Sequence, residues 1–291
     1  MVSWAGNMIP QAVRDWCQAN AFGEVAQVQP VAGGCINNGA LLKTGTAASF
    51  FLKTNTRTPP DMFEREAEGL RALQVGGGPH IPAVFLVGPD FILLEDLAPA
   101  RRVGDFWERF GGQLAALHSH TFSSFGFDHD NYIGSTPQPN PWTANGYQFF
   151  AEQRLGFQAK LAFERSLLDG QELKQVEKLA QRLPDLLPEQ PASLIHGDLW
   201  GGNALADAAG QPALIDPATH YGWAEAELGM TRLFGGFPDE FYRAYEQARP
   251  LPPGLGERLP VYNLYHLLNH LNLFGAGYHG QVQSILRRYA S

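Results

Sequence analysis

The chain has 291 residues, with 21 Lys and Arg against 29 Asp and Glu, so its formal charge is −8 with neutral histidines. This acidic balance argues against a nucleic-acid binder, which needs a basic stripe along the phosphates. Two cysteines, Cys17 and Cys35, are too few for a disulfide-stapled secreted scaffold, and no apolar run approaches the roughly 18 residues of a membrane span. With no secretory leader at its start, we expect a cytoplasmic protein that binds neither nucleic acid nor membranes.

The first hundred residues predict a mixture of helices and strands. Apolar residues recur at helical spacing in two segments and form short apolar runs elsewhere. The Gly-rich segment 33–39 separates the first two of these runs and reads as a turn. In chain order the expected elements are a helix from Ile9 to about Phe22, strands at 27–31, 40–44 and 49–54, a helix at 63–73 and a strand at 91–97.

Beyond that strand the chain is mostly helical. One helix is expected at 106–118 and another around 261–271, where apolar residues recur every three or four positions. The Pro- and Asn-rich segment 135–142 and the segment 251–260 are expected to be loops between helices. A strand-rich part followed by a helix-rich part predicts an α+β protein with its division near residue 98.

The segment 193–218 carries the clearest chemical pattern. It holds a His-Gly-Asp triplet that ends at Asp198, then Asn203 five residues later, and Asp216 at the end of a second apolar strand. Phosphoryl transfer from ATP needs oxygen ligands for Mg²⁺ and one carboxylate that orients the attacking hydroxyl. An isolated Gly-Asp pair is usually a turn, but this spacing, with an apolar strand before each aspartate, favours a kinase. We expect Asp198 to orient the hydroxyl, and Asn203 and Asp216 to hold Mg²⁺.

A kinase also needs groups that hold ATP, and the N-terminal part offers a candidate ion pair. Lys53 lies near the end of the third strand, where a lysine reaches the α- and β-phosphates. An ordinary strand-edge lysine is the alternative interpretation. Glu66 lies on the apolar side of the next helix, so we expect Glu66, and not Glu64 or Glu68, to pair with Lys53.

Two further segments are candidates for nucleotide contacts. The Gly-rich turn with Gly33 and Gly34 lies where a kinase loop covers the phosphates, although any hairpin turn can contain glycines. By its order along the chain, the strand at 91–97 supplies the hinge. We therefore expect Glu95, Asp96 and Leu97 to border adenine, chiefly through the main chain.

Several other patterns are weaker. Residues 275–280 match G-x-G-x-x-G, but they follow a predicted helix and only 11 residues remain after them, too few for a βαβ unit. His118 and His120 end a helix, where imidazoles can meet free carbonyls, and His196 is expected to be a scaffold residue. A thiol in the glycine turn, Cys35, could be redox-sensitive if its pKa is lowered, although a small filler residue is the more common case.

Similarity to a known family is carried by longer stretches. In these stretches the chain resembles the fructosamine kinase (ketosamine-3-kinase) family. They are LIHGDLWGGN, IDPATHYGWAEAEL, LFGGFPDEFYRAY, YHLLNHLNLFG, STPQPN and the GGCIN turn. This resemblance covers nearly the whole chain. STPQPN and LFGGF are specific to the family, whereas HGD and IDP are shared with aminoglycoside and choline kinases.

The resemblance implies a two-lobed protein-kinase-like fold, with a nucleotide-binding lobe at 1–97 and a catalytic and substrate-binding lobe at 98–291. It implies ATP- and Mg²⁺-dependent phosphorylation of the sugar 3-hydroxyl of ketosamines, the Amadori products of sugars with amines, including glycated lysines on proteins. The 3-phosphate is unstable in this family, so the amine is released and a protein is deglycated. Whether the chain is a monomer or a dimer stays open.

Carried over by residue, the family pattern makes Asp198 the catalytic base. Two positions depart from it, namely Gly201-Gly202, where Ser commonly precedes Gly, and Trp223, where His is frequent. Both bear on sugar preference. Two alternatives are an aminoglycoside-type phosphotransferase, which suits the acidic charge, and a catalytically silent binding protein, which would lack a catalytic residue.

Overall fold

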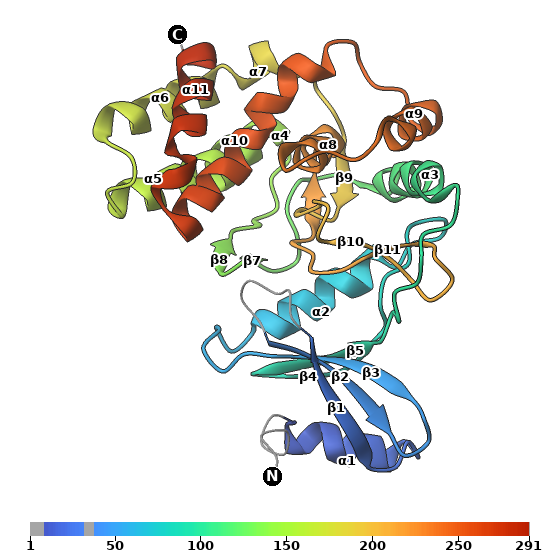
Figure 1. Cartoon of the computed structure of the whole chain (residues 1–291). Coiled ribbons are helices and arrows are strands. Elements are labelled where there is room, and N and C mark those ends of the chain that lie inside the picture. The colour runs from blue at the N-terminus through green and yellow to red at the C-terminus, as the bar shows by residue number, and fades with distance from the viewer. Residues whose placement is uncertain (1–8, 32–37, 291) are drawn as a thin grey trace.

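The computed structural model describes residues 9–31 and 38–290, and it has a sheet region joined to a larger helical region (Figure 1). The sheet region contains five antiparallel strands in the order β1-β2-β3-β5-β4. Its elements are α1 (Gln11–Ala19), β1 (Val25–Val31), β2 (Asn38–Thr44), β3 (Ser49–Thr54), α2 (Met62–Leu73), β4 (Val84–Gly88) and β5 (Phe91–Glu95).

The side chains of β3 point alternately to the two faces of the sheet, and each face packs against a different helix. Phe50 and Leu52 belong to an apolar cluster with α1, whereas Phe51 packs against a cluster that includes α2. Successive side chains of a strand point to opposite faces of the sheet. Lys53, two residues after Phe51, therefore shares the α2 face, where it is only 5% exposed.

The helical region follows β5 and holds the remaining short strands. The strand β9 lies between β12 and β6, and β10 pairs with β11. No helix in the described part of the chain combines the length and apolar character that crossing a bilayer requires. The elements are α3 (Phe106–His118), β6 (Thr121–Phe122), β7 (Asn131–Ile133), β8 (Thr136–Gln138), α4 (Gly146–Phe149), the π-helix η1 (Phe150–Gly156), α5 (Phe157–Glu164), α6 (Gly170–Gln181), α7 (Leu183–Leu186), β9 (Ala192–Ile195), β10 (Ala204–Ala206), β11 (Pro212–Leu214), β12 (His220–Gly222), α8 (Ala224–Leu233), α9 (Asp239–Ala248), α10 (Leu255–Phe274), the 3-10 helix η2 (Ala276–Tyr278) and α11 (His279–Tyr289).

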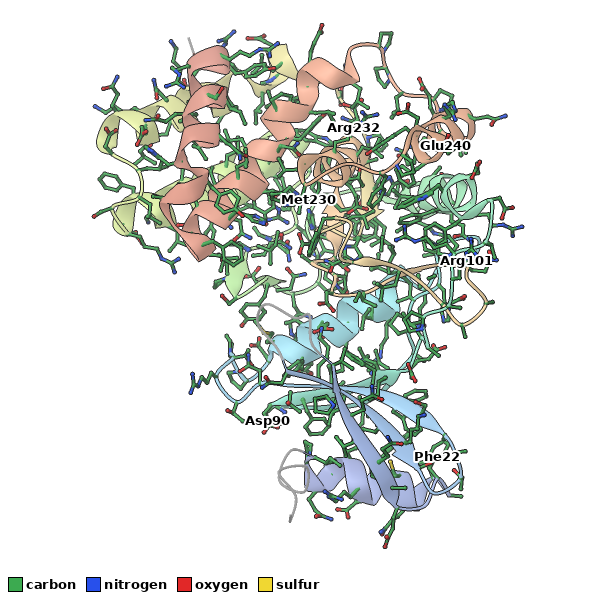
Figure 2. All side chains as sticks on the ribbon, viewed as in Figure 1. Phe22, Asp90, Arg101, Met230, Arg232 and Glu240 are labelled. Carbon is green, nitrogen blue, oxygen red and sulfur yellow. The ribbon has the colours of Figure 1, made fainter. Side chains whose placement is uncertain are left out.

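Two large apolar clusters hold these elements together. One lies among α5, α6, α10 and α11. The other begins at α2 and β5 and continues through α3 and α9 to β9 and β11, so it joins the sheet region to the helical region. Figure 2 shows the side chains on the elements of both regions. The predicted α+β class is confirmed, whereas the lobe boundary after residue 97 stays a prediction.

Three details differ from the sequence-based expectation. The strand β4 is not foreseen, because its mostly half-buried residues show no alternation of apolar and polar side chains. The expected loop at 135–142 contains β8, which pairs with β7. The expected loop at 251–260 ends at Gly254, because α10 already begins at Leu255 and carries Pro260 inside it. Arg258 fixes this early start through hydrogen bonds of 2.6–2.9 Å to two carbonyls of the preceding loop and to Glu225.

Close packing of α3 on α9 predicts opposite effects at two adjacent glycines. A Cβ on Gly111 would overlap the carbonyl oxygen of Phe241, whereas a Cβ on Gly112 has nothing within 4 Å. We expect Gly111→Ala to lower the free energy of unfolding by about 1–3 kcal/mol, because the helices must separate. Gly112→Ala should raise it by about 0.5–1 kcal/mol through helix propensity. Urea denaturation of both variants checks this, and equal effects would contradict the packing.

Candidate active site

A sharp turn after β9 places the first predicted catalytic residue. Gly197 has φ +85°, and a Cβ there would overlap the carbonyl oxygen of Ala218, so only glycine fits. His196 Nε2 donates to the carbonyl of Ile215 at 2.8 Å, and His196 Nδ1 accepts the N–H of Asp198 at 3.3 Å. This pattern confirms His196 as a scaffold residue that ties the turn to the end of β11.

A buried carboxylate of α8, which the sequence pattern does not single out, holds the same turn. Glu227 accepts the backbone N–H groups of His196 at 3.0 Å and Gly197 at 2.6 Å. It also accepts a hydrogen bond of 2.9 Å from His118 Nε2, and both side chains are fully buried. The expectation that His118 meets helix-end carbonyls is therefore wrong, because its ring is bound by Glu227 and by the Tyr245 hydroxyl at 2.8 Å.

The ionisation of this pair follows from its surroundings. Burial alone would raise the pKa of Glu227, but the hydrogen bond and charge of His118 and the turn's N–H groups outweigh burial and lower it. Burial lowers the pKa of His118, with a smaller contribution from Arg249. We conclude that the carboxylate of Glu227 accepts hydrogen bonds from the imidazole N–H of His118 and from the main chain of the turn.

Asp198 follows this turn and is only partly exposed. Burial raises the pKa of Asp198 to about 7, and the negative charges of Asp216 and Glu227 add to this, whereas a hydrogen bond from Asn203 opposes it. A carboxyl group that titrates near neutrality can both take and release a proton at physiological pH. Tyr265 of α10 lies within electrostatic reach of the same carboxylate.

Asn203 joins the two aspartate loops. Its Nδ2 donates to the carbonyl oxygens of Asp198 at 2.9 Å and Asp216 at 3.4 Å. Because the amide nitrogen is engaged, the amide oxygen of Asn203 and the carboxylate of Asp216 are the atoms left for a cation. Asp216 has φ +57°, and its side chain is 44% exposed. These oxygen donors, beside a second carboxylate, fit Mg²⁺. Among the described residues, no group of three or more His, Cys, Asp or Glu side chains is placed to hold a metal ion.

Lys53 reaches the same place from the sheet. Its Nζ lies 2.7 Å from Glu66 Oε1 and 2.7 Å from Asp216 Oδ1. Burial alone would lower the pKa of Lys53, but the charges of the two carboxylates outweigh burial and raise it, so the ammonium stays charged. Glu64 and Glu68 are turned to Arg65 instead, at 3.1 and 2.8 Å.

The expected hinge residues use their side chains to bind protein groups. Glu95 Oε2 lies 3.2 Å from His80 Nε2, and Asp96 accepts a hydrogen bond of 2.5 Å from Ser49 Oγ. Leu97 is buried. A role of these three residues toward adenine would therefore run through their main chain.

Other expectations fall outside the described residues or away from the site. Gly33, Gly34 and Cys35 lie outside the described ranges. Residues 275–280 join the end of α10 to η2 and α11 without a strand, which agrees with rejecting a dinucleotide fold. Trp223 is 3% exposed and packs in the helical core, and its expected influence on sugar preference stays a prediction.

Comparison with known proteins decides the family. The fructosamine kinase family model matches residues 8–291. The chain belongs to the fructosamine kinase family. It is 44% identical over 269 residues to a protein of Synechocystis sp. assigned as a ketoamine kinase, with 91% of this chain and 90% of that protein covered. It is 40% identical over 290 residues to a chloroplastic protein-ribulosamine 3-kinase of Oryza sativa subsp. japonica, with coverages of 95% and 83%.

A solved structure of the same family shares the fold. A protein of Thermobifida fusca assigned as a fructosamine-3-kinase has a TM-score of 0.87 and 32% sequence identity, with 97% of this chain and 98% of that chain covered. The predicted two-lobed kinase fold is confirmed, and this family member is an ATP-dependent kinase. The alternative of a silent binding protein is not favoured, because Lys53, Asp198, Asn203 and Asp216 are all present and lie in one connected network.

Glu227 holds the catalytic turn, so an isosteric substitution at Glu227 should lower the stability of the protein. Glu227→Gln keeps the shape of the side chain but offers an amide nitrogen to a main-chain donor, so at least one buried N–H loses its acceptor. We expect the free energy of unfolding to fall by about 3 kcal/mol, since hydrogen bonds to buried charged groups are strong. Urea denaturation measures it, with Glu246→Gln on the exposed face of α9 as the matched control. A loss no larger than that of the control would contradict the anchoring.

Proposed function

We propose that this kinase transfers the γ-phosphoryl group of ATP to the sugar 3-hydroxyl of ribulosamines and fructosamines. The observation that supports this most is the double contact of Lys53 with Glu66 and Asp216 at 2.7 Å each. It puts a phosphate-binding cation beside a carboxylate suited to a metal, the pairing that phosphoryl transfer from ATP requires.

Each residue of the network has a part in this proposal. Lys53, fixed by Glu66, holds the α- and β-phosphates. Asp198 accepts the proton of the sugar hydroxyl as that oxygen attacks, and its pKa of about 7 suits this exchange. The main chain at 95–97 receives adenine, and the turn with Gly33 and Gly34 covers the phosphates.

A divalent cation is part of the proposal. Asn203 and Asp216 would hold Mg²⁺, which would neutralise negative charge on the transferring phosphoryl group. Burial and then the negative charge of Asp216 raise the pKa of Asp198, and a cation at this position would offset the charge of Asp216.

The substrate class is inferred from relatives that carry ketoamine kinase and protein-ribulosamine 3-kinase names. We infer that small ketosamines and glycated lysines on proteins are acceptors, and that the 3-phosphate then breaks down and releases the amine. The reaction would repair proteins in the cytoplasm, with the chain acting as a monomer or a dimer.

The substrate class is tested by Mg²⁺-dependent ADP release with ribulose-lysine, fructose-lysine and kanamycin, and by ³¹P NMR of the product. We expect turnover on at least one ketosamine, with the phosphate on O3. Turnover on kanamycin alone would move the protein to the aminoglycoside phosphotransferases and contradict the proposal.

In the same assay, Asp198→Asn should lower kcat by about 10²- to 10⁴-fold, since it removes the proton acceptor. Binding of ATP should persist, because the phosphate-binding lysine is untouched. Asp185→Asn, at an exposed carboxylate of α7, is the control. A loss of only a few-fold in Asp198→Asn would remove the base from its assigned role.

A further inference from the structure

The β7–β8 hairpin lies between α2 and the segment that follows Asp216. Asn131 is paired with Gln138, and Tyr132 with Pro137. Because side chains alternate across a strand, Asn131 and Gln138 share one face of the hairpin and Tyr132 points to the other. The first pair is buried, at 5% and 1% exposed. The hairpin therefore has a buried amide face and an opposite face that carries a tyrosine.

The amide face binds the main chain just after Asp216. Asn131 Nδ2 donates to the carbonyl of Thr219 at 2.8 Å, and Gln138 Nε2 donates to the carbonyl of Ala218 at 3.0 Å. The Tyr265 hydroxyl of α10 donates to Gln138 Oε1 at 2.5 Å. Gln138 thus connects the segment after the proposed metal ligand with a residue that lies within electrostatic reach of Asp198.

A buried arginine supports the strand end beside this face. Arg154 of the π-helix η1 donates to the carbonyl of Pro139 and to Asn140 Oδ1, both at 2.7 Å. Asn140 in turn donates to Asn131 Oδ1 at 2.9 Å. Hydrogen bonds from η1, through Arg154 and Asn140, and from α10, through Tyr265, therefore hold the amide face.

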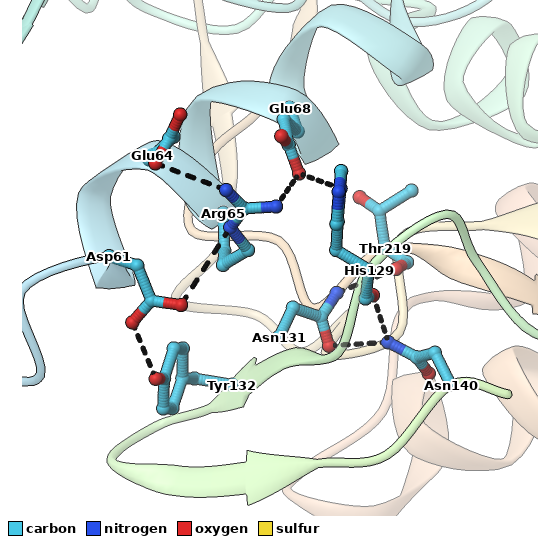
Figure 3. A network of polar contacts seen from close by, with 9 residues as sticks. All are labelled: Asp61, Glu64, Arg65, Glu68, His129, Asn131, Tyr132, Asn140 and Thr219. Carbon is cyan, nitrogen blue, oxygen red and sulfur yellow. Dashed lines mark hydrogen bonds and ion pairs between the residues drawn. The ribbon is translucent and has the colours of Figure 1, made fainter.

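The opposite face of the hairpin binds α2 (Figure 3). The Tyr132 hydroxyl donates to Asp61 Oδ1, at the residue before α2, at 2.8 Å. Burial and the hydrogen bond to Asp61 raise the pKa of Tyr132 to about 12, so the hydroxyl keeps its proton and donates. Just before β7, His129 Nδ1 lies 3.2 Å from Glu68 Oε2 of α2. A Cβ on Gly69 of α2 would come within 2.8 Å of Thr219 Oγ1, so α2 also packs directly on the segment after Asp216.

We propose that Tyr132 and Gln138 are positioning residues that hold α2 and the Asp216 segment in the arrangement in which Lys53 can bridge Glu66 and Asp216. This rests on the proposed function. In protein kinases, phosphorylation of an activation loop controls the same two conditions. These are the position of the helix that carries the glutamate and the position of the aspartate that binds the metal. Here only seven residues separate Asp216 from α8, and the hairpin contacts both parts at once.

The contact with α2 is tested by Tyr132→Phe, which removes one hydroxyl and keeps the ring. Hydrogen exchange of α2 amides should speed up, while exchange of α10 amides stays the same. We expect kcat to fall by about ten-fold and the KM for MgATP to rise, because small displacements of catalytic groups are costly. The KM for the ketosamine should not change. Tyr289→Phe, which loses a comparable hydrogen bond to the Glu257 carbonyl, is the control and should leave every value unchanged.

A double-mutant cycle separates positioning from general destabilisation. In an Asp61→Ala background, Tyr132→Phe should cause no further loss of kcat, because its partner is already gone. For the amide face, Gln138→Met keeps the length of the side chain, and we expect the Mg²⁺ concentration for half-maximal activity to rise several-fold. Unchanged α2 exchange in Tyr132→Phe, full additivity in the cycle, or an unchanged Mg²⁺ requirement in Gln138→Met would overturn the proposal.

Failure of the proposed function would look different. Hydrogen exchange of α2 and calorimetric binding of MgATP need no acceptor sugar. If the unmodified protein phosphorylates no ketosamine, these two measurements still show whether Tyr132 holds α2 in position. In that case only the substrate assignment is wrong.

Discussion

One ammonium group between two carboxylates joins the parts of this molecule that come from distant stretches of the sequence. Glu66 is 13 residues from Lys53, and Asp216 is 163 residues from it. Burying Lys53 and Glu66 costs several kcal/mol per ion, and the cost is recovered only where the geometry pairs the charges closely. The ion pairs therefore require β3, α2 and the end of β11 to be in place together.

Buried hydrogen bonds provide that placement. Glu227 fixes the catalytic turn through main-chain N–H groups, Asn203 ties the two aspartate loops, and the buried Asn131–Gln138 pair binds the segment after Asp216. Such networks are favourable when every donor and acceptor is satisfied, and costly when one is lost. Asp198 and Asp216 can then stay partly exposed to substrates while the side chains that hold them in place are buried.

Residues with local patterns could be predicted, and residues with distant partners could not. Glu66 was distinguishable from Glu64 and Glu68 because helical periodicity shows which side is apolar. The spacing of Asp198, Asn203 and Asp216 along apolar strands likewise marked them as candidates. In contrast, Glu227 lies in the mostly buried helix α8. Nothing near it in the sequence shows that its partners are the turn at 196–197 and His118. The segment 135–142 is predicted to be a loop because its prolines are typical of loops, although it contains the short strand β8. The partner of Tyr132 in this hairpin, Asp61, is 71 residues away in the sequence.

The most direct test of the central ion pair is the rate of phosphoryl transfer by Lys53→Met, compared with Lys43→Met on the exposed side of β2. The account predicts that kcat/KM for MgATP falls by at least about 10²-fold in Lys53→Met, because both phosphate contact and alignment of Asp216 are lost. Lys43→Met should behave as the unmodified protein. A folded Lys53→Met variant that transfers phosphate within about three-fold of the normal rate would contradict the account.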